Sequence, residues 1–342
     1  MALPAALRAH FAGKRVLITG GLGFLGSSLA LELVDSGANV LVVDALLPNQ
    51  GGNRFNLNPA EGRVRINIAD IRNRNSMRVL VQEQDFLFNC SASLSHTGSM
   101  DDPFTDLENN CQGHLSLLEA CRLENRALKI VLAATRSQYG PALRLPVEED
   151  HPQRPRDVNG IHHIASEAYH LLYQQSYGIR VAVLRLPNLY GPRQQMRHGQ
   201  QGFLNWFMRR ALDNESLSLF GDGAPLRDFN YVDDAVAALL LAAANPAADG
   251  EVFNLGCPEP LTVRAIAERI VHAAGRGRVE MVPYPTSAQR VEVGDFYCDY
   301  SKIRRMLGWE PVVDFDEGLR RTLDYYRANR EQYWTTALDL EP

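Results

Sequence analysis

The stretch that decides the fold is KRVLITGGLGFLGSSLALELVDSGANVLVVD, residues 14–44. Residues 16–19 form a short apolar run rich in β-branched side chains, which is typical of a buried strand. Residues 27–36 are predicted to be helical, and the apolar run at 40–43 predicts a second strand that ends at Asp44. The order is therefore strand, glycine-rich turn, helix, strand and acid.

The turn after the first strand carries Gly20, Gly23 and Gly26 at a spacing of three. Glycines let the backbone approach a pyrophosphate closely, and the start of the helix offers free N–H groups and the positive end of its dipole. A carboxylate at the position of Asp44 can accept hydrogen bonds from an adenosine ribose. The pattern predicts dinucleotide binding, and the alternative is a turn whose glycines only permit tight helix packing.

Composition narrows the class of protein. The chain has 342 residues, of which 45% are hydrophobic, enough for a sizeable core in one or two domains. Its net charge of -5 comes from well-mixed charges, which argues against a nucleic-acid partner. Five cysteines without a close pair argue against disulfides or a metal site and favour a reducing, cytoplasmic compartment. The longest apolar run, 235–244, is too short to span a membrane, and residues 1–12 are predicted to form a lead-in helix or arm.

Strand and helix patterns alternate through the first half of the chain. Such alternation predicts an α/β fold with a doubly wound parallel sheet that is covered by helices on both faces. Apolar runs predict further strands at 64–68, 86–89, 129–133 and 181–184, and helical patterns fall at 77–84, 106–124 and 161–177.

The pattern loosens in the last third, where we expect a helix near 203–212 and a return strand at 252–255. This part is predicted to form a smaller C-terminal α/β lobe over the carboxyl edge of the sheet, where ligands of such sheets bind. The expected division assigns residues 1–187 and 228–257 to the dinucleotide-binding domain, and 188–227 and 258–342 to the lobe.

Eight short motifs occur in an order that resembles the extended short-chain dehydrogenase/reductase family, the nucleotide-sugar epimerases and dehydratases. They are TGGLGFLG at 19–26, DIR at 70–72, YG at 139–140, RLPNLYGPR at 185–193, RDF at 227–229, YVDD at 231–234, FNLG at 253–256 and LGWEP at 307–311. The resemblance covers nearly the whole chain. It implies a Rossmann domain that holds NAD tightly and a lobe that binds a nucleoside diphosphate sugar.

The resemblance also implies a homodimer joined by two helices of each subunit, here 106–124 and 161–177. Both helices carry more apolar side chains than one sheet surface needs, which supports a four-helix contact between two copies.

Cofactor contacts follow from the same resemblance. Asp44 favours NAD, because a carboxylate repels the 2′-phosphate of NADP, whereas Arg54 leaves NADP open, because an arginine could hold that phosphate. The expected NAD contacts are Gly20, Gly23, Phe24, Leu25, Asp44, Asp70, Ile71, Cys90, Ser91, Ala92, Asn109, His163 and Pro187.

The catalytic region departs from the family pattern, which has a Ser or Thr followed by a Tyr and a Lys four residues apart. Thr135 fits the first position, but Asn159 stands at the tyrosine position and His163 at the lysine position. An asparagine amide can orient a sugar hydroxyl but cannot exchange a proton near neutral pH. Neutral histidine is a plausible base, so activity that depends on His163 is expected to rise with pH through roughly 6 to 7.

Three alternatives remain open for this departure. His163 or another nearby group, with His96, His162 and Tyr139 as the candidates, replaces the tyrosine as proton carrier. Otherwise Thr135 and a chain of waters relay the proton slowly, or the protein binds NAD and a sugar nucleotide without turnover.

The two residues after Thr135 exclude some reactions of the family. In its 4,6-dehydratases these positions are Asp and Glu, and in its decarboxylases the second is Glu. Here they are Arg136 and Ser137, and neither supplies a carboxylate. Epimerisation by transient oxidation of a sugar carbon needs neither residue and is therefore favoured.

Substrate contacts are also implied by the resemblance. Arg227 matches the family's phosphate-binding arginine, since a diphosphate needs a forked cation. The expected substrate contacts are His96, Arg136, Asn188, Phe203, Leu204, Arg227 and Arg290. The leading hypothesis is an NAD-dependent nucleotide-sugar epimerase, and the alternatives are a catalytically silent NAD-binding protein or an oxidoreductase that releases a keto sugar.

Overall fold

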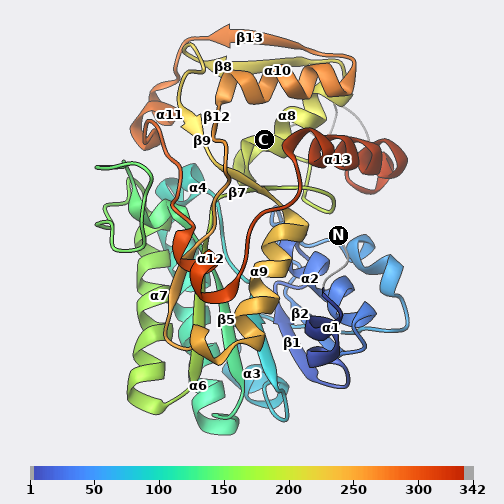
Figure 1. The fold of residues 1–342 in the computed structure, drawn as a ribbon, viewed down its shortest axis with the longest axis vertical. Helices are drawn as coiled ribbons and strands as arrows, with labels where there is room; N and C mark the ends of the chain where they lie inside the picture. The colour runs from blue at the N-terminus through green and yellow to red at the C-terminus, as the bar shows by residue number, and fades with distance from the viewer. Residues whose placement is uncertain (1–3, 335–342) are drawn as a thin grey trace.

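The computed structural model describes residues 4–334, apart from the side chains of Gln200 and Ser287. Seven parallel strands form one sheet in the order β11-β6-β5-β4-β1-β2-β3, which confirms the predicted doubly wound sheet (Figure 1). The strands are β1 (Arg15–Thr19), β2 (Asn39–Asp44), β3 (Arg65–Ile68), β4 (Phe86–Asn89), β5 (Lys129–Thr135), β6 (Arg180–Leu186) and β11 (Val252–Asn254). The strand order reverses between β1 and β4, where ligands of such sheets bind.

Helices cover both faces of this sheet because neighbouring residues of each strand point to opposite sides. In β1, Val16 and Ile18 pack into the core on one face, and Leu17 packs into the core on the other. The first face is covered by α1 (Ala5–Phe11), α2 (Phe24–Asp35) and α9 (Val232–Ala244). The second is covered by α3 (Arg74–Leu80), α6 (Gly113–Glu124) and α7 (Val158–Tyr177).

A smaller lobe lies beyond the carboxyl ends of the strands, in the upper part of Figure 1. It contains α8 (Phe203–Leu212), α10 (Val263–Ala274), α13 (Phe315–Asn329) and the parallel pair β8 (Ser216–Phe220) and β13 (Arg278–Val282). Two further pairs join the lobe to the sheet region: β7 (Asn188–Tyr190) with β10 (Phe229–Tyr231), and β9 (Leu226–Arg227) with β12 (Leu261–Thr262). The expected division into 1–187 with 228–257 and 188–227 with 258–342 stays a prediction. Within the second part, α12 (Ser301–Leu307) contacts β11 of the sheet.

Shorter elements complete the chain. They are η1 (Arg54–Ala60), α4 (His96–Asp101), α5 (Pro103–Leu107), η2 (Glu108–Gln112), η3 (Arg136–Tyr139), η4 (Gly199–Gln201), η5 (Pro246–Ala248), α11 (Thr286–Val291) and η6 (Arg330–Gln332). The helix predicted over 106–124 is thus interrupted by η2, a π turn, and π turns are frequent at functional sites. None of the helices within residues 4–334 combines the length and the apolar character that a bilayer crossing requires.

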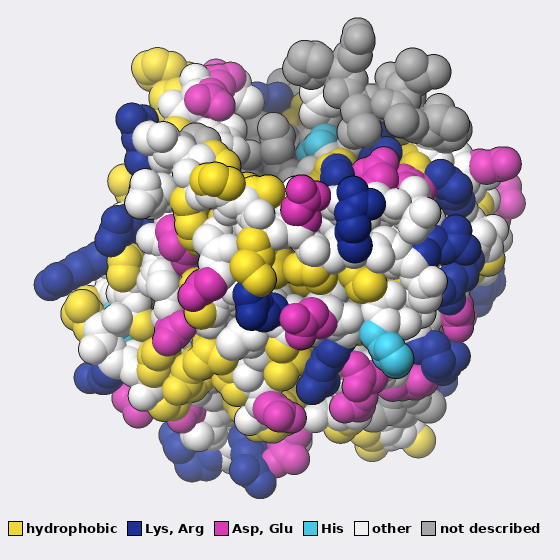
Figure 2. Space-filling model, turned by 90° about the horizontal axis from the view of Figure 1, so that it is seen from above, with side chains coloured by type: hydrophobic (Ala, Val, Ile, Leu, Met, Phe, Trp, Pro, Cys, Tyr) yellow, Lys and Arg dark blue, Asp and Glu magenta, His cyan; other side chains and the backbone are white. Residues whose placement is uncertain are grey.

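Both signs of charge are mixed on the part of the lobe's outer surface that the described residues form. On the face seen in Figure 2, Lys and Arg side chains are interspersed with Asp and Glu side chains and with apolar ones. This agrees with the mixed charges and the net charge of -5 in the sequence.

Candidate active site

A cleft of about 610 Å³ opens at the carboxyl ends of the sheet strands and extends under the lobe. Almost every predicted site residue lines it. Those on the cofactor and catalytic side are Gly20, Gly23, Phe24, Leu25, Asp44, Asp70, Ile71, Cys90, Ser91, Ala92, Asn109, Thr135, Asn159, His163 and Pro187. Those on the substrate side are His96, Arg136, Asn188, Phe203, Leu204 and Arg227.

The glycine turn has the shape that a dinucleotide pyrophosphate requires. Gly20 has a φ of +66°, and a Cβ there would lie 2.6 Å from the carbonyl oxygen of Cys90. A Cβ on Gly26 would lie 2.3 Å from the carbonyl oxygen of Gly20. Helix α2 begins at Phe24, and no side chain caps its first N–H groups. The open N–H groups and the positive end of the helix dipole therefore fit a bound phosphate.

Asp44 ends β2 with its carboxylate fixed by the backbone. Its Oδ2 accepts a hydrogen bond from the N–H of Leu22 at 3.0 Å, and its Oδ1 accepts one from Leu46 at 2.9 Å. Burial raises the pKa of Asp44, and these two backbone hydrogen bonds oppose the rise. Arg54 is exposed on η1 and does not line the cleft, so the predicted alternative of an arginine clamp for a 2′-phosphate is not supported.

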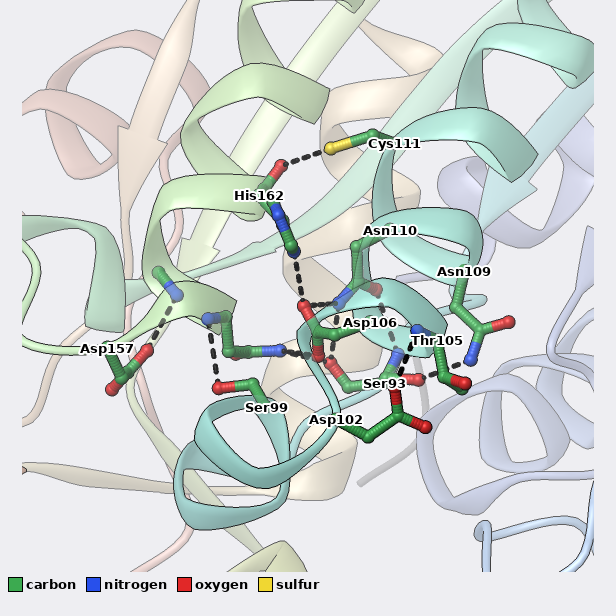
Figure 3. Close-up of polar contacts among 12 residues, drawn as sticks. Ser93, Ser99, Asp102, Thr105, Asp106, Asn109, Asn110, Cys111, Asp157 and His162 are labelled. Carbon is green, nitrogen blue, oxygen red and sulfur yellow. Dashed lines mark hydrogen bonds and ion pairs between the residues drawn. The ribbon is translucent and has the colours of Figure 1, made fainter.

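Asn159 holds the loop that follows β4 rather than pointing its amide nitrogen at a substrate. Its Nδ2 donates to the carbonyl oxygen of Ser93 at 2.6 Å and to Oδ2 of Asp106 at 3.0 Å. Asn110, on the π turn, binds both residues as well: it donates to the Ser93 carbonyl at 3.1 Å and to Asp106 Oδ1 at 3.1 Å (Figure 3). The buried Asp106 carboxylate thus joins Asn159 and Asn110 in one hydrogen-bond network.

His163 lies one helical turn beyond Asn159 and is almost completely buried, with 3% exposure. Burial lowers its pKa to about 4, although the charge of Asp106 acts in the opposite direction. The imidazole is therefore neutral at pH 7. This corrects the expected rise of activity through pH 6 to 7, because a base with this pKa would be deprotonated well below that range. Its Nε2 is buried without a hydrogen-bond partner, which fits a donor or acceptor toward a bound cofactor ribose.

The other candidate proton carriers differ in whether they line the cleft. His162 directs Nδ1 to Asp106 Oδ1 at 2.7 Å and does not line the cleft (Figure 3). Tyr139 is fully buried, donates to Asn254 Oδ1 at 2.7 Å and accepts from Arg185 at 2.6 Å, and burial raises its pKa. Both side chains are therefore structural. His96 lines the cleft, and its Nδ1 lies 2.7 Å from Oδ2 of Asp157.

Two arginines lie on the substrate side in different environments. Arg227 is buried and forms an ion pair with Glu292, 2.6 Å between Nη2 and Oε1. Arg136 stacks over the ring of Phe296, 4.8 Å from its centroid, so it does not belong to a solvated loop. Within the described residues Arg136 has no ion-pair partner, which leaves its guanidinium available to an anionic ligand.

The prediction for Arg290 is not supported. Its side chain is exposed on α11 and does not line the cleft, because the helix turns Ala288 and Val291 toward the cleft instead. The sequence reasoning also missed Asp106, Asp157 and Glu292. Only Asp157 had a local signal: an acid three residues before Gly160 marks a helix start, and its Oδ1 accepts the Gly160 N–H at 2.7 Å.

Comparison with known proteins agrees with this geometry. The model of the NAD dependent epimerase/dehydratase family matches residues 16–256. UDP-glucose 4-epimerase of Mycolicibacterium smegmatis is 31% identical over 324 residues, covering 93% of this chain and all of that protein.

Two solved structures illustrate the likeness in three dimensions. The epimerase Mth375 from Methanothermobacter thermautotrophicus has a TM-score of 0.88 and 27% identity, over 95% of each chain. The NAD complex of UDP-glucose 4-epimerase from Thermus thermophilus has a TM-score of 0.82 and 32% identity, over 92% of this chain and 99% of that one. Together with the glycine turn and Asp44, these findings identify NAD as the cofactor. The chain belongs to the NAD-dependent epimerase/dehydratase family.

Proposed function

We propose that this chain is an NAD-dependent nucleotide-sugar epimerase in which Asn159 and His163 replace the Tyr and Lys of the family. The observation that carries the proposal is the placement of Thr135, Asn159 and His163 in the lining of one cleft with the glycine turn. Bound NAD supplies the hydride acceptor and donor. The substrate is a nucleoside diphosphate sugar, whose sugar carbon is oxidised and then reduced from the opposite face.

Each polar residue near the reacting carbon has a role that its contacts allow. The hydroxyl oxygen of Thr135 accepts a hydrogen bond from the Ser137 N–H at 3.2 Å, so its own hydrogen is free to orient a sugar hydroxyl. Neutral His163 positions the cofactor through Nε2, and Asn159 keeps the loop after β4 in place. Epimerisation is favoured over dehydration and decarboxylation because Arg136 and Ser137 follow Thr135, where those reactions use carboxylates.

A catalytically silent NAD- and sugar-binding protein is the second candidate. Asn159 favours it, because both of its observed Nδ2 contacts are structural and its amide cannot exchange a proton. The test is single-turnover NADH absorbance with a panel of UDP, GDP, CDP and dTDP sugars. Epimerase chemistry predicts a transient NADH signal with at least one sugar, and an epimerised product by chromatography. If neither the parent nor the Asn159→Tyr, His163→Lys double variant gives NADH with any sugar, the binding-protein function is supported instead.

We also propose a homodimer. Helices α5 and α7 expose Phe104, Leu107, Ile161 and Leu172 on their outer faces, with exposures of 75%, 43%, 55% and 51%. Leu107, Ile161 and Leu172 belong to the two helical regions predicted to join the subunits, and Phe104 lies just before the first of them. Burying such an apolar face against its own copy is the usual arrangement of a two-fold dimer.

A further inference from the structure

One histidine of the cleft is held by a carboxylate that the fold itself fixes. His96 is the first residue of α4, and its Nδ1 lies 2.7 Å from Oδ2 of Asp157. Asp157 is the N-cap of α7: its Oδ1 accepts the N–H of Gly160 at 2.7 Å, and its side chain is only 5% exposed. Asp157 is therefore a rigid acceptor that orients the imidazole of His96.

The same imidazole also borders the cleft. The His96 side chain is 46% exposed and lines the cleft with Thr135, Asn159 and His163. The pair is close to the catalytic cluster, because the charges of both His96 and Asp157 act on the pKa of His163. Burial tends to raise the pKa of Asp157, but the hydrogen bond and charge of His96 hold it below its ordinary value. Asp157 is thus an ionised partner for the imidazole.

A carboxylate that accepts Nδ1–H leaves the Nε2 lone pair of a histidine free to take a proton, and it stabilises the imidazolium that results. Building on the proposed function, we infer that His96 is the proton carrier of this site and that Asp157 is its positioning residue. Oxidation of a sugar C–OH to C=O releases a hydride, which the bound nicotinamide accepts, and a proton, which passes to His96 Nε2. Reduction of the carbonyl returns both, so each cycle balances.

The alternatives among the nearby groups fit this role less well. His163 is buried and suits the cofactor, whereas His162 is paired with Asp106 and Tyr139 with Arg185, both outside the cleft. His96 is the candidate that combines a fixed carboxylate partner with access to the substrate side.

The test compares two histidines that each have a carboxylate 2.7 Å from Nδ1. His96→Gln should lower single-turnover NADH formation by about 10²–10⁴, the usual effect of losing a general base. His162→Gln, the matched control, should stay within about threefold of the parent, since its ring lies outside the cleft. NAD affinity by calorimetry should stay within about tenfold in both variants. Added imidazole should restore activity to His96→Gly and leave His163→Gly unchanged.

Asp157 is tested with Asp157→Asn, because asparagine caps a helix as well as aspartate does. The variant should lower kcat with little change in KM, and it should add little to the effect of His96→Gln. If Asp157 had a purely structural role, the rate losses of Asp157→Asn and His96→Gln would multiply in the double variant. Nitrogen-15 NMR of the parent without substrate should show His96 protonated at Nδ1, a readout that does not depend on turnover. Full activity of His96→Gln, or a His96 that is protonated at Nε2, would overturn the role of His96. The proposed epimerase function would still be supported in that case, provided that the parent protein is active. A parent inactive with the whole sugar panel would overturn both.

Discussion

Protonation of His163 gives the sharpest quantitative prediction. Its pKa is lowered from 6.5 to about 4 by burial in the fold. Between these values the unfolded chain binds the proton more readily than the folded chain, so stability is lost as the pH falls from about 6.5 toward 4. For pKa values of 6.5 and 4, moving from pH 7 to pH 5 removes about 2 kcal/mol of unfolding free energy through this one residue.

The assay is urea unfolding of the parent and of His163→Gln at pH 7 and pH 5. Two other buried histidines, His114 and His170, have pKa values lowered to about 3 and about 4, chiefly by burial, and they act in the same direction in both proteins. The parent should therefore lose about 2 kcal/mol more than His163→Gln between the two pH values. His272→Gln, on the exposed surface of α10, is the control and should follow the parent. An equal loss in the parent and in His163→Gln would refute the buried, neutral state of His163.

Three further predictions follow from the site. The Asp44 carboxylate is fixed beside the glycine turn, and Arg54 does not line the cleft, where it would have to hold the 2′-phosphate of NADP. Calorimetry should therefore show that NAD binds at least tenfold more tightly than NADP, a difference of about 1.4 kcal/mol. Arg136→Met should weaken binding of the nucleotide sugar that the panel selects by about 10- to 100-fold and leave NAD affinity unchanged, since a charge-assisted contact contributes about 1.5–3 kcal/mol. Equal sugar affinities in the parent and the variant would contradict this. Light scattering should show a dimer at micromolar concentration, and Phe104→Glu with Ile161→Glu should give a monomer, because both side chains are exposed on the proposed contact face.

The cofactor half of the site could be predicted from the sequence because its signals are local. The spacing of Gly20, Gly23 and Gly26 predicts the turn, in which Gly20 and Gly26 have no room for a Cβ, and Asp44 ends the next strand along the chain. Strand ends in a parallel sheet meet at one edge, so residues after β1, β2, β4, β5 and β6 converge without any information on long-range contacts.

The acid/base half of the site depends on contacts between residues far apart in the sequence, which motif spacing does not predict. Asp157 is 61 residues from His96, and Asp106 is 53 residues from Asn159, so both pairs appear only when α7 packs beside α4 and α5. The prediction that Arg290 contacts the substrate is not supported, for a related reason. A shift of one or two residues on α11 turns a side chain away from the cleft, and motif matching does not resolve such a shift.

The proposed replacement of Tyr and Lys at positions 159 and 163 requires the proton carrier to lie on another element. A tyrosine at position 159 would need a nearby cation to lower its pKa, and His163 supplies none because burial keeps it neutral at pH 7. In this chain Asn159 instead binds Asp106, whose carboxylate also receives His162 and Asn110. Asn159 therefore has a structural role in this network. A proton carrier must then enter the cleft from outside this network, and α4 places His96 there with Asp157 behind it.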